Sequence, residues 1–119
     1  MLPSDMMEVR EYLDHRSRSP YADWFDNLPA PAAAKVATAI TRLAQGNLSN
    51  VKAVRSGVLE CRIDFGPGCR IYLGRDGNRL VILLGGGTKK KQQRDINEAI
   101  ARWQDYKQRK REEGESSWL

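Results

Sequence analysis

Residues 58–73 contain two strand-like segments around a tight turn, and this pattern restricts the fold more than any other feature. Apolar and polar residues alternate through 58–63 and again through 69–73, which is the period of a strand with one buried face. The intervening Phe-Gly-Pro-Gly segment, residues 65–68, has the composition of a turn. The sequence therefore predicts two neighbouring antiparallel strands whose side chains alternate between two faces.

A third strand is expected directly after these two. Asp76-Gly77 is a strong signal for a two-residue hairpin, because a type I′ turn needs positive φ at both central positions. The run 80–84 is wholly apolar, which is typical of a strand buried on both faces. The three glycines at 85–87 are expected to end this strand.

Helical signals occupy much of the remaining chain, after a first strand expected over residues 8–13. Ser19 before Pro20 predicts a helix start, since serine caps a helix and proline fits its first turn. The Pro-Ala-Pro segment at 29–31 breaks this helix, and a second helix then runs to Gly46. Apolar residues at helical spacing are Val36, Ile40, Leu43 and Ala44 in the second helix, and Ile96, Ala99, Ile100 and Trp103 in a final helix from about Lys91.

Together these elements predict an α+β fold with the order β-α-α-β-β-β-α. An antiparallel N-terminal helical hairpin and a C-terminal helix are expected to pack on a mostly antiparallel sheet. The 119 residues are expected to form a single domain, with a core over about 7–106 and a polar C-terminal extension over 107–119 that frays from Glu112. Residues 1–6 have the composition of a loose leader, with Met6 or Met7 as alternative starts.

Basic residues are concentrated near the C-terminus. Residues 89–111 hold nine Lys and Arg against three Asp and Glu, so this segment exceeds the formal net charge of +5 of the whole chain. Such a concentration indicates a polyanionic or acidic protein partner, or else only a solvated helix face. No apolar run is long enough to span a bilayer and the N-terminus lacks a secretory pattern, so a cytoplasmic location is expected.

Strand parity collects charged side chains on one face of the predicted sheet. Glu60 and Arg62 share that face with Arg70 and Tyr72 of the next strand. The other face is apolar, and helices are expected to cover it. If Arg75 pairs with Asn78 in the hairpin, this apolar face pairs Leu73 with Leu80 and Ile71 with Ile82.

Two interpretations of the charged face remain open. Two arginines beside a carboxylate and a phenol suit a phosphate site, because a guanidinium binds phosphate oxygens through two parallel hydrogen bonds. The alternative is an ordinary solvated face with cross-strand ion pairs, either Arg70 with Asp64 or Arg62 with Glu60.

Few residues are available for metal binding or for histidine-dependent catalysis. His15 is the sole histidine, which excludes a Ser-His-Asp triad and a paired-histidine metal site. Cys61 and Cys69 lie on the apolar face by parity, where Cys61 opposes Ile71 or Leu73 rather than Cys69. Both cysteines are therefore expected to be reduced core residues.

Several of these motifs resemble the RelE/ParE toxin superfamily. The resemblance is carried by residues 46–52 and by 57–72, above all by the Gly-Pro-Gly hairpin with the Arg-x-Tyr that follows it. It extends to Trp24-Phe25-Asp26-Asn27-Leu28, Leu83-Leu84, Gly86-Gly87, Lys89, Gln92 and Asp95-Ile96, and covers about 7–106. Within the superfamily, the chain is most similar to the HigB-like subgroup of addiction-module killer proteins.

The resemblance implies a RelE-like, microbial RNase-like fold and a toxin of a type II toxin–antitoxin system that cuts mRNA in the ribosomal A site. In that reaction the 2′-OH attacks the adjacent phosphate, which requires a base, positive charge for the phosphorane and an acid for the leaving oxygen. Neither a metal nor another cofactor is required. The implied partners are a helix-turn-helix antitoxin, the ribosome and mRNA, with DNA contacted only through the antitoxin.

The resemblance also implies roles for individual residues. Arg70 matches the arginine that contacts the scissile phosphate, and Arg62 is expected to assist it. Lys89, or Lys90 beside it, matches a basic residue after the last strand. Glu60 is either a general base or an orienting partner of Arg62. Residues expected to contact RNA are Lys52, Arg55, Lys90 and Lys91.

The chain departs from the family pattern at two positions. Cys69 stands where the subgroup usually has Tyr, and by parity this changes the packing rather than the catalysis. The last helix lacks an early catalytic Tyr that some relatives have, and Tyr72 is the candidate substitute. Two other functions use the same fold: a ParE-like toxin that poisons DNA gyrase, and a non-catalytic homologue that only binds its antitoxin. The clustered Glu60, Arg62 and Arg70 favour the nuclease.

Overall fold

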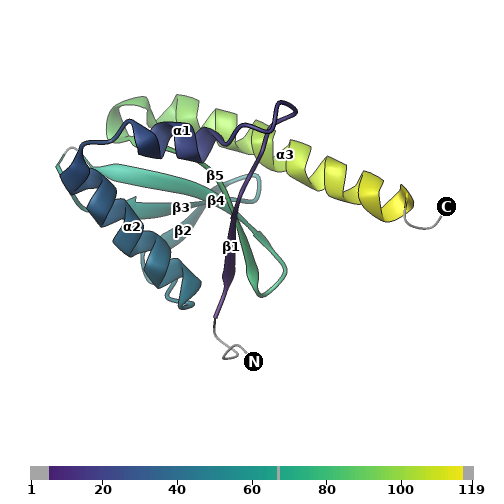
Figure 1. Cartoon of the computed structure of the whole chain (residues 1–119), viewed down its shortest axis with the longest axis horizontal. Helices are drawn as coiled ribbons and strands as arrows, with labels where there is room; N and C mark the ends of the chain where they lie inside the picture. The colour runs from purple at the N-terminus through teal and green to yellow at the C-terminus, as the bar shows by residue number, and fades with distance from the viewer. Residues whose placement is uncertain (1–5, 67, 117–119) are drawn as a thin grey trace.

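The computed structural model describes residues 6–66 and 68–116, with the backbone alone for 115 and 116, and forms an α+β fold around one five-stranded open sheet. The elements in chain order are β1 (Glu8–Glu11), α1 (Pro20–Asp26), α2 (Ala30–Ala44), β2 (Val51–Arg55), β3 (Val58–Ile63), β4 (Cys69–Asp76), β5 (Leu80–Thr88), a 3₁₀ turn η1 (Lys89–Lys91) and α3 (Gln92–Ser116). The strand order is β1-β5-β4-β3-β2 (Figure 1). Only the β1–β5 pair is parallel, so the predicted α+β class and mostly antiparallel sheet are confirmed. Of the leader predicted for residues 1–6, only Met6 lies within the described residues.

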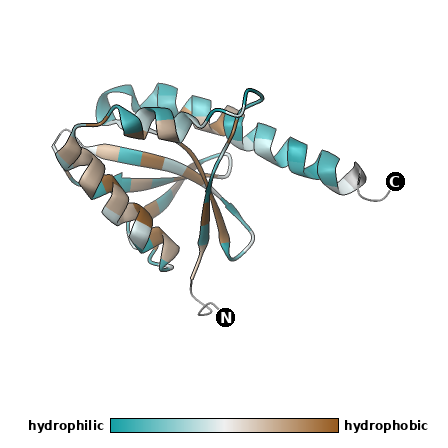
Figure 2. Ribbon diagram, viewed as in Figure 1, coloured by the Kyte–Doolittle hydropathy of each residue, from teal (hydrophilic) through white to brown (hydrophobic). Residues whose placement is uncertain are grey.

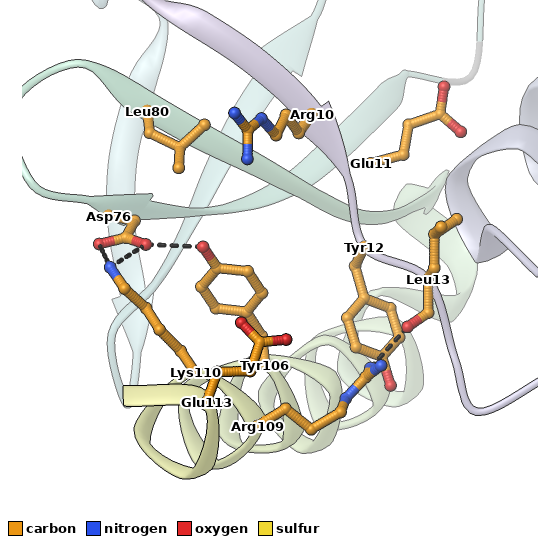
Figure 3. Close-up of a pocket in the computed structure, with 10 residues that line it drawn as sticks. All are labelled: Arg10, Glu11, Tyr12, Leu13, Asp76, Leu80, Tyr106, Arg109, Lys110 and Glu113. Atoms are coloured by element: carbon orange, nitrogen blue, oxygen red, sulfur yellow. Dashed lines mark hydrogen bonds and ion pairs between the residues drawn. The ribbon is translucent and has the colours of Figure 1, made fainter. Parts of the chain in front are cut away.

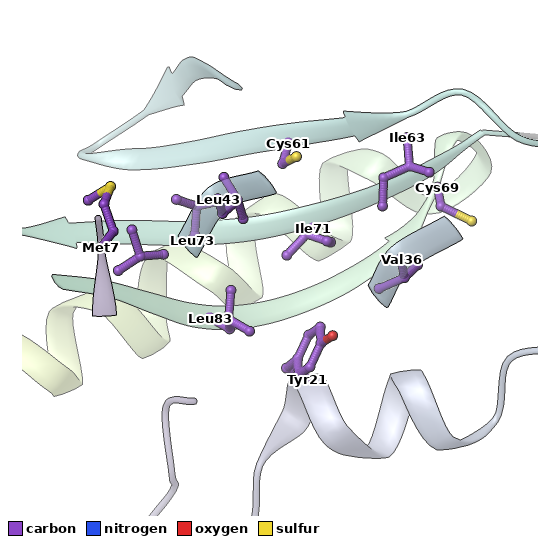
Figure 4. Packing of buried hydrophobic residues seen from close by; sticks show 11 residues of the cluster. Met7, Tyr21, Val36, Leu43, Cys61, Ile63, Cys69, Ile71, Leu73 and Leu83 are labelled. Atoms are coloured by element: carbon purple, nitrogen blue, oxygen red, sulfur yellow. The ribbon is translucent and has the colours of Figure 1, made fainter. Parts of the chain in front are cut away.

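Helices cover both faces of the sheet, whereas the sequence predicted helices on the apolar face alone. One core cluster joins α1 and α2 to the face that carries Ile71, Leu73 and Leu83 (Figure 4). A second cluster joins α3 to the opposite face, where Trp103 packs with Tyr72. The charged face of the prediction is therefore an interior layer, because the apolar stripe of α3 needs a surface to bury.

The sheet has one strand more than the sequence predicted. The missed strand is β2, a short edge strand that pairs with β3 and whose side chains are mostly exposed. The turn that joins them holds Ser56 at φ 53° and Gly57 at φ 85°. Two consecutive positive φ angles between paired strands are the mark of a type I′ hairpin. The Ser-Gly dipeptide was thus the missed signal for β2.

The predicted hairpin at Asp76-Gly77 has a different register. Asp76 pairs with Leu80, so three residues rather than two form the loop. An irregularity between Tyr72 and Leu73 shifts the register again. Leu73 therefore pairs with Leu83 rather than Leu80, and Ile71 pairs with Gly86 rather than Ile82. As a result, Ile82 packs on the α3 side of the sheet.

Strand β5 continues through the glycine run that was expected to end it. Each glycine leaves space that a side chain from a helix fills. A Cβ on Gly86 would overlap the indole ring of Trp24 in α1, and one on Gly85 would lie 2.7 Å from Arg102 Nη1 in α3. A Cβ on Gly87 would overlap the carboxyl group of Asp95. The glycines thus allow both helical layers to approach the backbone closely.

The helices begin and end close to the expected residues, except at the end of α3. The Ser19 hydroxyl accepts a hydrogen bond from Ala22 N at 3.0 Å, which confirms the predicted cap of α1. The helices α1 and α2 form a V in Figure 1 rather than the predicted antiparallel pair. Helix α3 continues past Glu112 to Ser116 instead of fraying; residues 117–119 lie outside the described residues. No described helix is long and apolar enough to cross a membrane.

Two tyrosine–aspartate hydrogen bonds fix α3 to the sheet, and Figure 3 shows the one between Tyr106 and Asp76. Tyr12 Oη donates to Asp105 Oδ2 at 2.6 Å, and Tyr106 Oη donates to Asp76 Oδ2 at 2.6 Å. Lys110 Nζ also lies 2.6 Å from Asp76 Oδ2. The carboxylates and hydroxyls at this contact satisfy one another, which holds the middle of α3 over the end of the β4–β5 hairpin.

Candidate functional site

A buried ion pair lies at the centre of the candidate site. Arg70 Nε donates to Glu60 Oε1 at 2.6 Å, with the arginine side chain 4% exposed and the glutamate side chain 0% exposed. The pairing is diagonal, because Glu60 is in register with Tyr72 and Arg62 with Arg70. The ion pairs of the alternative interpretation, Arg70 with Asp64 or Arg62 with Glu60, are therefore wrong, because Glu60 pairs with Arg70 instead.

Two polar atoms beside this ion pair are buried without a partner among the described residues. They are Arg70 Nη1 and the Tyr72 hydroxyl. Burial, with the neighbouring charges of Glu60 and Asp95, raises the pKa of Tyr72 to about 12, against the opposing effect of Arg70. The phenol is therefore protonated at neutral pH. Buried polar groups nearly always have partners, so these two atoms mark a place prepared for a polar ligand or water.

The start of α3 supplies two residues that the sequence analysis matched to the family motif but did not assign to the site. Gln92 Nε2 donates to Glu60 Oε2 at 3.3 Å. The Asp95 carboxyl group occupies the space left by Gly87, which is the register partner of Arg70. The signal for both was their helical spacing with the apolar stripe of α3, because Gln92 precedes Ile96 by four residues and Asp95 precedes Ala99 by four.

Asp95 has few partners for a partly buried carboxylate. Its side chain is 11% exposed, and Arg94 is the one cation within ion-pair distance of it among the described residues, with Nη2 3.7 Å from Asp95 Oδ1. Burial, the largest effect, raises the pKa of Asp95 above its usual value, while nearby cations including Arg94 and Lys91 oppose the rise. A carboxylate with free lone pairs and a raised pKa is a suitable proton acceptor.

Exposed lysines and one arginine surround the buried pair and form a basic rim. Its members are Lys52, Arg62, Lys89, Lys90 and Lys91. Lys52 is in register with Glu60, and Arg62 with Arg70. The three lysines of η1 directly follow the residue that pairs with Cys69. The structure thus brings these predicted residues to one end of the sheet.

The remaining predicted residues have clear positions. Arg55 is exposed on β2 and donates to Asn97 of α3 rather than lying free on the surface. Cys61 pairs with Ile71 in the sheet, and both cysteines are free and buried, as predicted. Burial raises the pKa of both thiols, as expected for core residues.

The arrangement suits binding of an anionic group at a mostly enclosed point. A guanidinium that one carboxylate holds in place can direct its remaining N–H groups at phosphate oxygens. The Arg70 side chain is only 4% exposed. Its Nη1 lies beside the β3–β4 turn, where a Cβ on Gly68 would be 3.6 Å from it. The basic rim adds positive charge at the approach to this point.

Known proteins similar to this chain include one individual protein and one protein family. A 47% identical stretch of 68 residues is shared with an uncharacterized protein of Haemophilus influenzae, covering 57% of this chain and 69% of that protein. The family described as phage-derived protein Gp49-like (DUF891) matches residues 23–104, which include all of β2–β5 and the start of α3. The chain therefore belongs to the Gp49-like family, which is a RelE/HigB-type toxin-like family.

Proposed function

We propose that this protein is the toxin of a type II toxin–antitoxin system and acts as a ribosome-dependent mRNA endoribonuclease of the HigB-like kind. The observation that carries the proposal is the state of Arg70. Glu60 fixes its guanidinium at 2.6 Å, while Nη1 has no partner among the described residues and lies in the same layer as the unpaired Tyr72 hydroxyl. Such a preorganised cation is what an enzyme needs to stabilise a phosphorane.

The proposed reaction is attack of the 2′-OH on the adjacent phosphate, without a metal or other cofactor. The Asp95 carboxylate accepts the 2′-OH proton, the 2′-oxygen bonds to phosphorus, and Arg70 stabilises the negative charge that develops on the phosphoryl oxygens. The bond to the 5′-oxygen then breaks, and Tyr72 donates the proton that this oxygen takes up. Glu60 acts as the orienting partner of Arg70 rather than as the base, because Arg70 and Gln92 donate hydrogen bonds to its two carboxylate oxygens.

The basic rim supports RNA as the substrate. Lys52, Arg62 and the η1 lysines are exposed and form no ion pair with another residue of the part of the chain that the structure describes. Exposed cations of this kind bind a phosphate backbone without regard to base sequence. The proposed partners are mRNA on the ribosome and a helix-turn-helix antitoxin, with DNA contacted only through that antitoxin.

Primer-extension mapping of translated mRNA after induction tests the proposal. We expect new 5′ ends inside coding regions, together with arrest of growth. Arg70→Lys keeps a cation beside Glu60 but loses the planar guanidinium, and we expect cleavage to fall by about 10² to 10³-fold. Arg42→Lys makes the same change on the exposed surface of α2 and serves as the matched control.

Three outcomes contradict this proposal in different ways. Full cleavage by a folded Arg70→Lys variant would show that the site is placed wrongly. Growth arrest without new mRNA ends, but with inhibited DNA supercoiling, would identify a gyrase poison. A protein that binds its antitoxin but neither arrests growth nor cuts RNA would be a non-catalytic homologue.

A further inference from the structure

A pocket lies away from the candidate catalytic site, beside the middle of α3. Its volume is about 390 Å³, which is within the range of sites for small ligands. The pocket lies between α3 and the end of β4, and Figure 1 shows that α3 extends well beyond the sheet. The residues that matter are Arg75, Trp103, Tyr106, Lys107, Lys110 and Arg111.

Two stacked aromatic rings form one wall of this pocket. The ring centroids of Trp103 and Tyr106 are 5.3 Å apart and the rings are within 6° of parallel. The indole is fixed against the sheet, because a Cβ on Gly74 would overlap its ring and one on Gly57 would lie 2.9 Å from Nε1. Trp103 is itself only 6% exposed, so it serves as the backing for Tyr106, whose ring is half-buried. A flat aromatic ring held in this way is a stacking surface that proteins offer to a nucleic-acid base.

Cations surround the aromatic wall, and most of them lack an acidic partner among the described side chains. Asp76 neutralises Lys110 at 2.6 Å. The Arg75 side chain is exposed and has neither a hydrogen bond nor an ion pair with another described residue. The Lys107 ammonium lies 5.6 Å from the centre of the Trp103 ring. Arg111 donates only to the uncharged Gln108 side chain. The pocket therefore has positive charge that is not compensated locally.

We propose that this pocket binds one nucleotide unit of a single-stranded RNA, with the base on the Tyr106 ring and phosphates on Arg75 and Lys107. An acidic protein segment would match the charge but would not use the Tyr106 ring. The binding site stands on its own geometry and rests on the proposed function only for the choice of RNA as the polymer.

The pocket is separate from the candidate catalytic site. Gly74, under the Trp103 ring, and Arg70 are four residues apart on β4, which is about 13 Å at the rise of a strand. The direct line between them runs beneath α3, because the core cluster of α3 fills this face of the sheet. A strand bound in the pocket would therefore pass around α3, whose outer surface is mostly hydrophilic (Figure 2). This path needs more than about four nucleotides, the number that would span the straight distance at about 3.4 Å each.

The test measures binding of a fluorescent 2′-O-methyl RNA of about 12 nucleotides to the full chain at several salt concentrations. Because this RNA has no free 2′-OH, it is not cleaved, and binding is measured independently of catalysis. We expect Arg75→Ala with Lys107→Ala to weaken binding at least about tenfold and to lower the slope of log K against log salt by about 1.4, the value for two lost phosphate contacts. Lys35→Ala with Arg42→Ala removes the same two charges from the exposed surface of α2 and is the matched control.

A second variant tests the aromatic wall. Tyr106→Leu removes the ring, and we expect binding to weaken by about 5 to 150-fold, the range for loss of one base stack, with little change in the salt slope. Circular dichroism and urea unfolding must show that each variant is folded. Equal effects of the two double variants would overturn the proposal, because only net charge would then matter.

Two further arms distinguish other ligands. Binding of AMP as tight as that of the RNA strand would overturn the proposal in favour of a free-nucleotide site. Displacement of the RNA by poly-glutamate at similar concentrations would overturn it in favour of an acidic protein partner. Cleavage of mRNA does not enter either readout, so loss of the proposed function and loss of this inference are recognised separately.

Discussion

Removal of one member of the Glu60–Arg70 pair is expected to destabilise the fold severely. Glu60→Met keeps the length and much of the volume of the side chain but leaves the Arg70 guanidinium buried without a counter-charge. Both side chains are at most 4% exposed, so water cannot replace the lost carboxylate in the folded state. An uncompensated buried charge costs about 3 to 5 kcal/mol, out of the roughly 5 to 15 kcal/mol that holds a domain folded.

The double variant Glu60→Met with Arg70→Met is expected to recover most of this loss. Replacing a buried ion pair by apolar residues of similar volume is often neutral, because the desolvation of both charges is avoided. We expect its free energy of unfolding to be within about 2 kcal/mol of the parent. Urea unfolding followed by tryptophan fluorescence measures all four members of this double-mutant cycle. The double variant also gives a folded protein that lacks the proposed phosphate-binding cation.

An exposed pair provides the comparison for this cycle. Glu8 and Arg10 lie 2.9 Å apart, but their side chains are 53% and 62% exposed. Glu8→Gln is therefore expected to change the free energy of unfolding by at most about 1 kcal/mol. If Glu60→Met were as mild as Glu8→Gln, the site would open to water in solution, and the reasoning from burial would be refuted.

Three other perturbations follow from the structure. Gly86→Ala is expected to cost about 1 to 3 kcal/mol in urea unfolding because its Cβ overlaps Trp24, and an unchanged stability would contradict this packing. The pKa of Asp76 is lowered, first by Lys110 and then by Tyr106, so its contribution to stability is complete above its unfolded pKa near 3.8 and is lost as the pH falls through the folded value. Asp76→Asn should flatten that part of an acid-unfolding curve, and an identical curve would show that the carboxylate is not coupled to folding. Ser19→Ala is expected to cost about 1 kcal/mol through loss of the α1 cap, measured against Ser49→Ala on an exposed loop.

Local pattern predicted the composition of the charged face but not its surroundings. The alternation in β3 and β4 placed Glu60, Arg62, Arg70 and Tyr72 on one face, and the strand register confirms this. On that alternation alone, helices are expected on the apolar face and the charged face is expected to stay uncovered. In the structure, α3 covers it, because helix position depends on contacts between residues far apart in the chain. The covering helix excludes water from Glu60 and Arg70, so each charge needs the other as its partner, and the two form a diagonal ion pair.

Turn and glycine signals show a similar limit. Asp76-Gly77 and Ser56-Gly57 are alike as dipeptides, yet only Ser56-Gly57 has two positive φ angles. Which dipeptide forms a two-residue turn depends on how the flanking strands pair. The run at 85–87 reads as the end of a strand because glycine has low strand propensity. Only the approach of Trp24, Arg102 and Asp95 from two layers makes glycine the residue that fits there.

The parallel pairing of β1 with β5 has a consequence for the timing of folding. Glu8 pairs with Leu80, so the first strand waits for a partner that is synthesised 72 residues later. At about 5 to 20 residues per second, this delay is about 4 to 14 seconds on the ribosome. During that interval β1 has no sheet to join, and the helices α1 and α2 lack the strands that bury their apolar faces. The nascent chain therefore acquires its complete sheet only after β5 has been synthesised, and α3, which covers the charged face, follows later still.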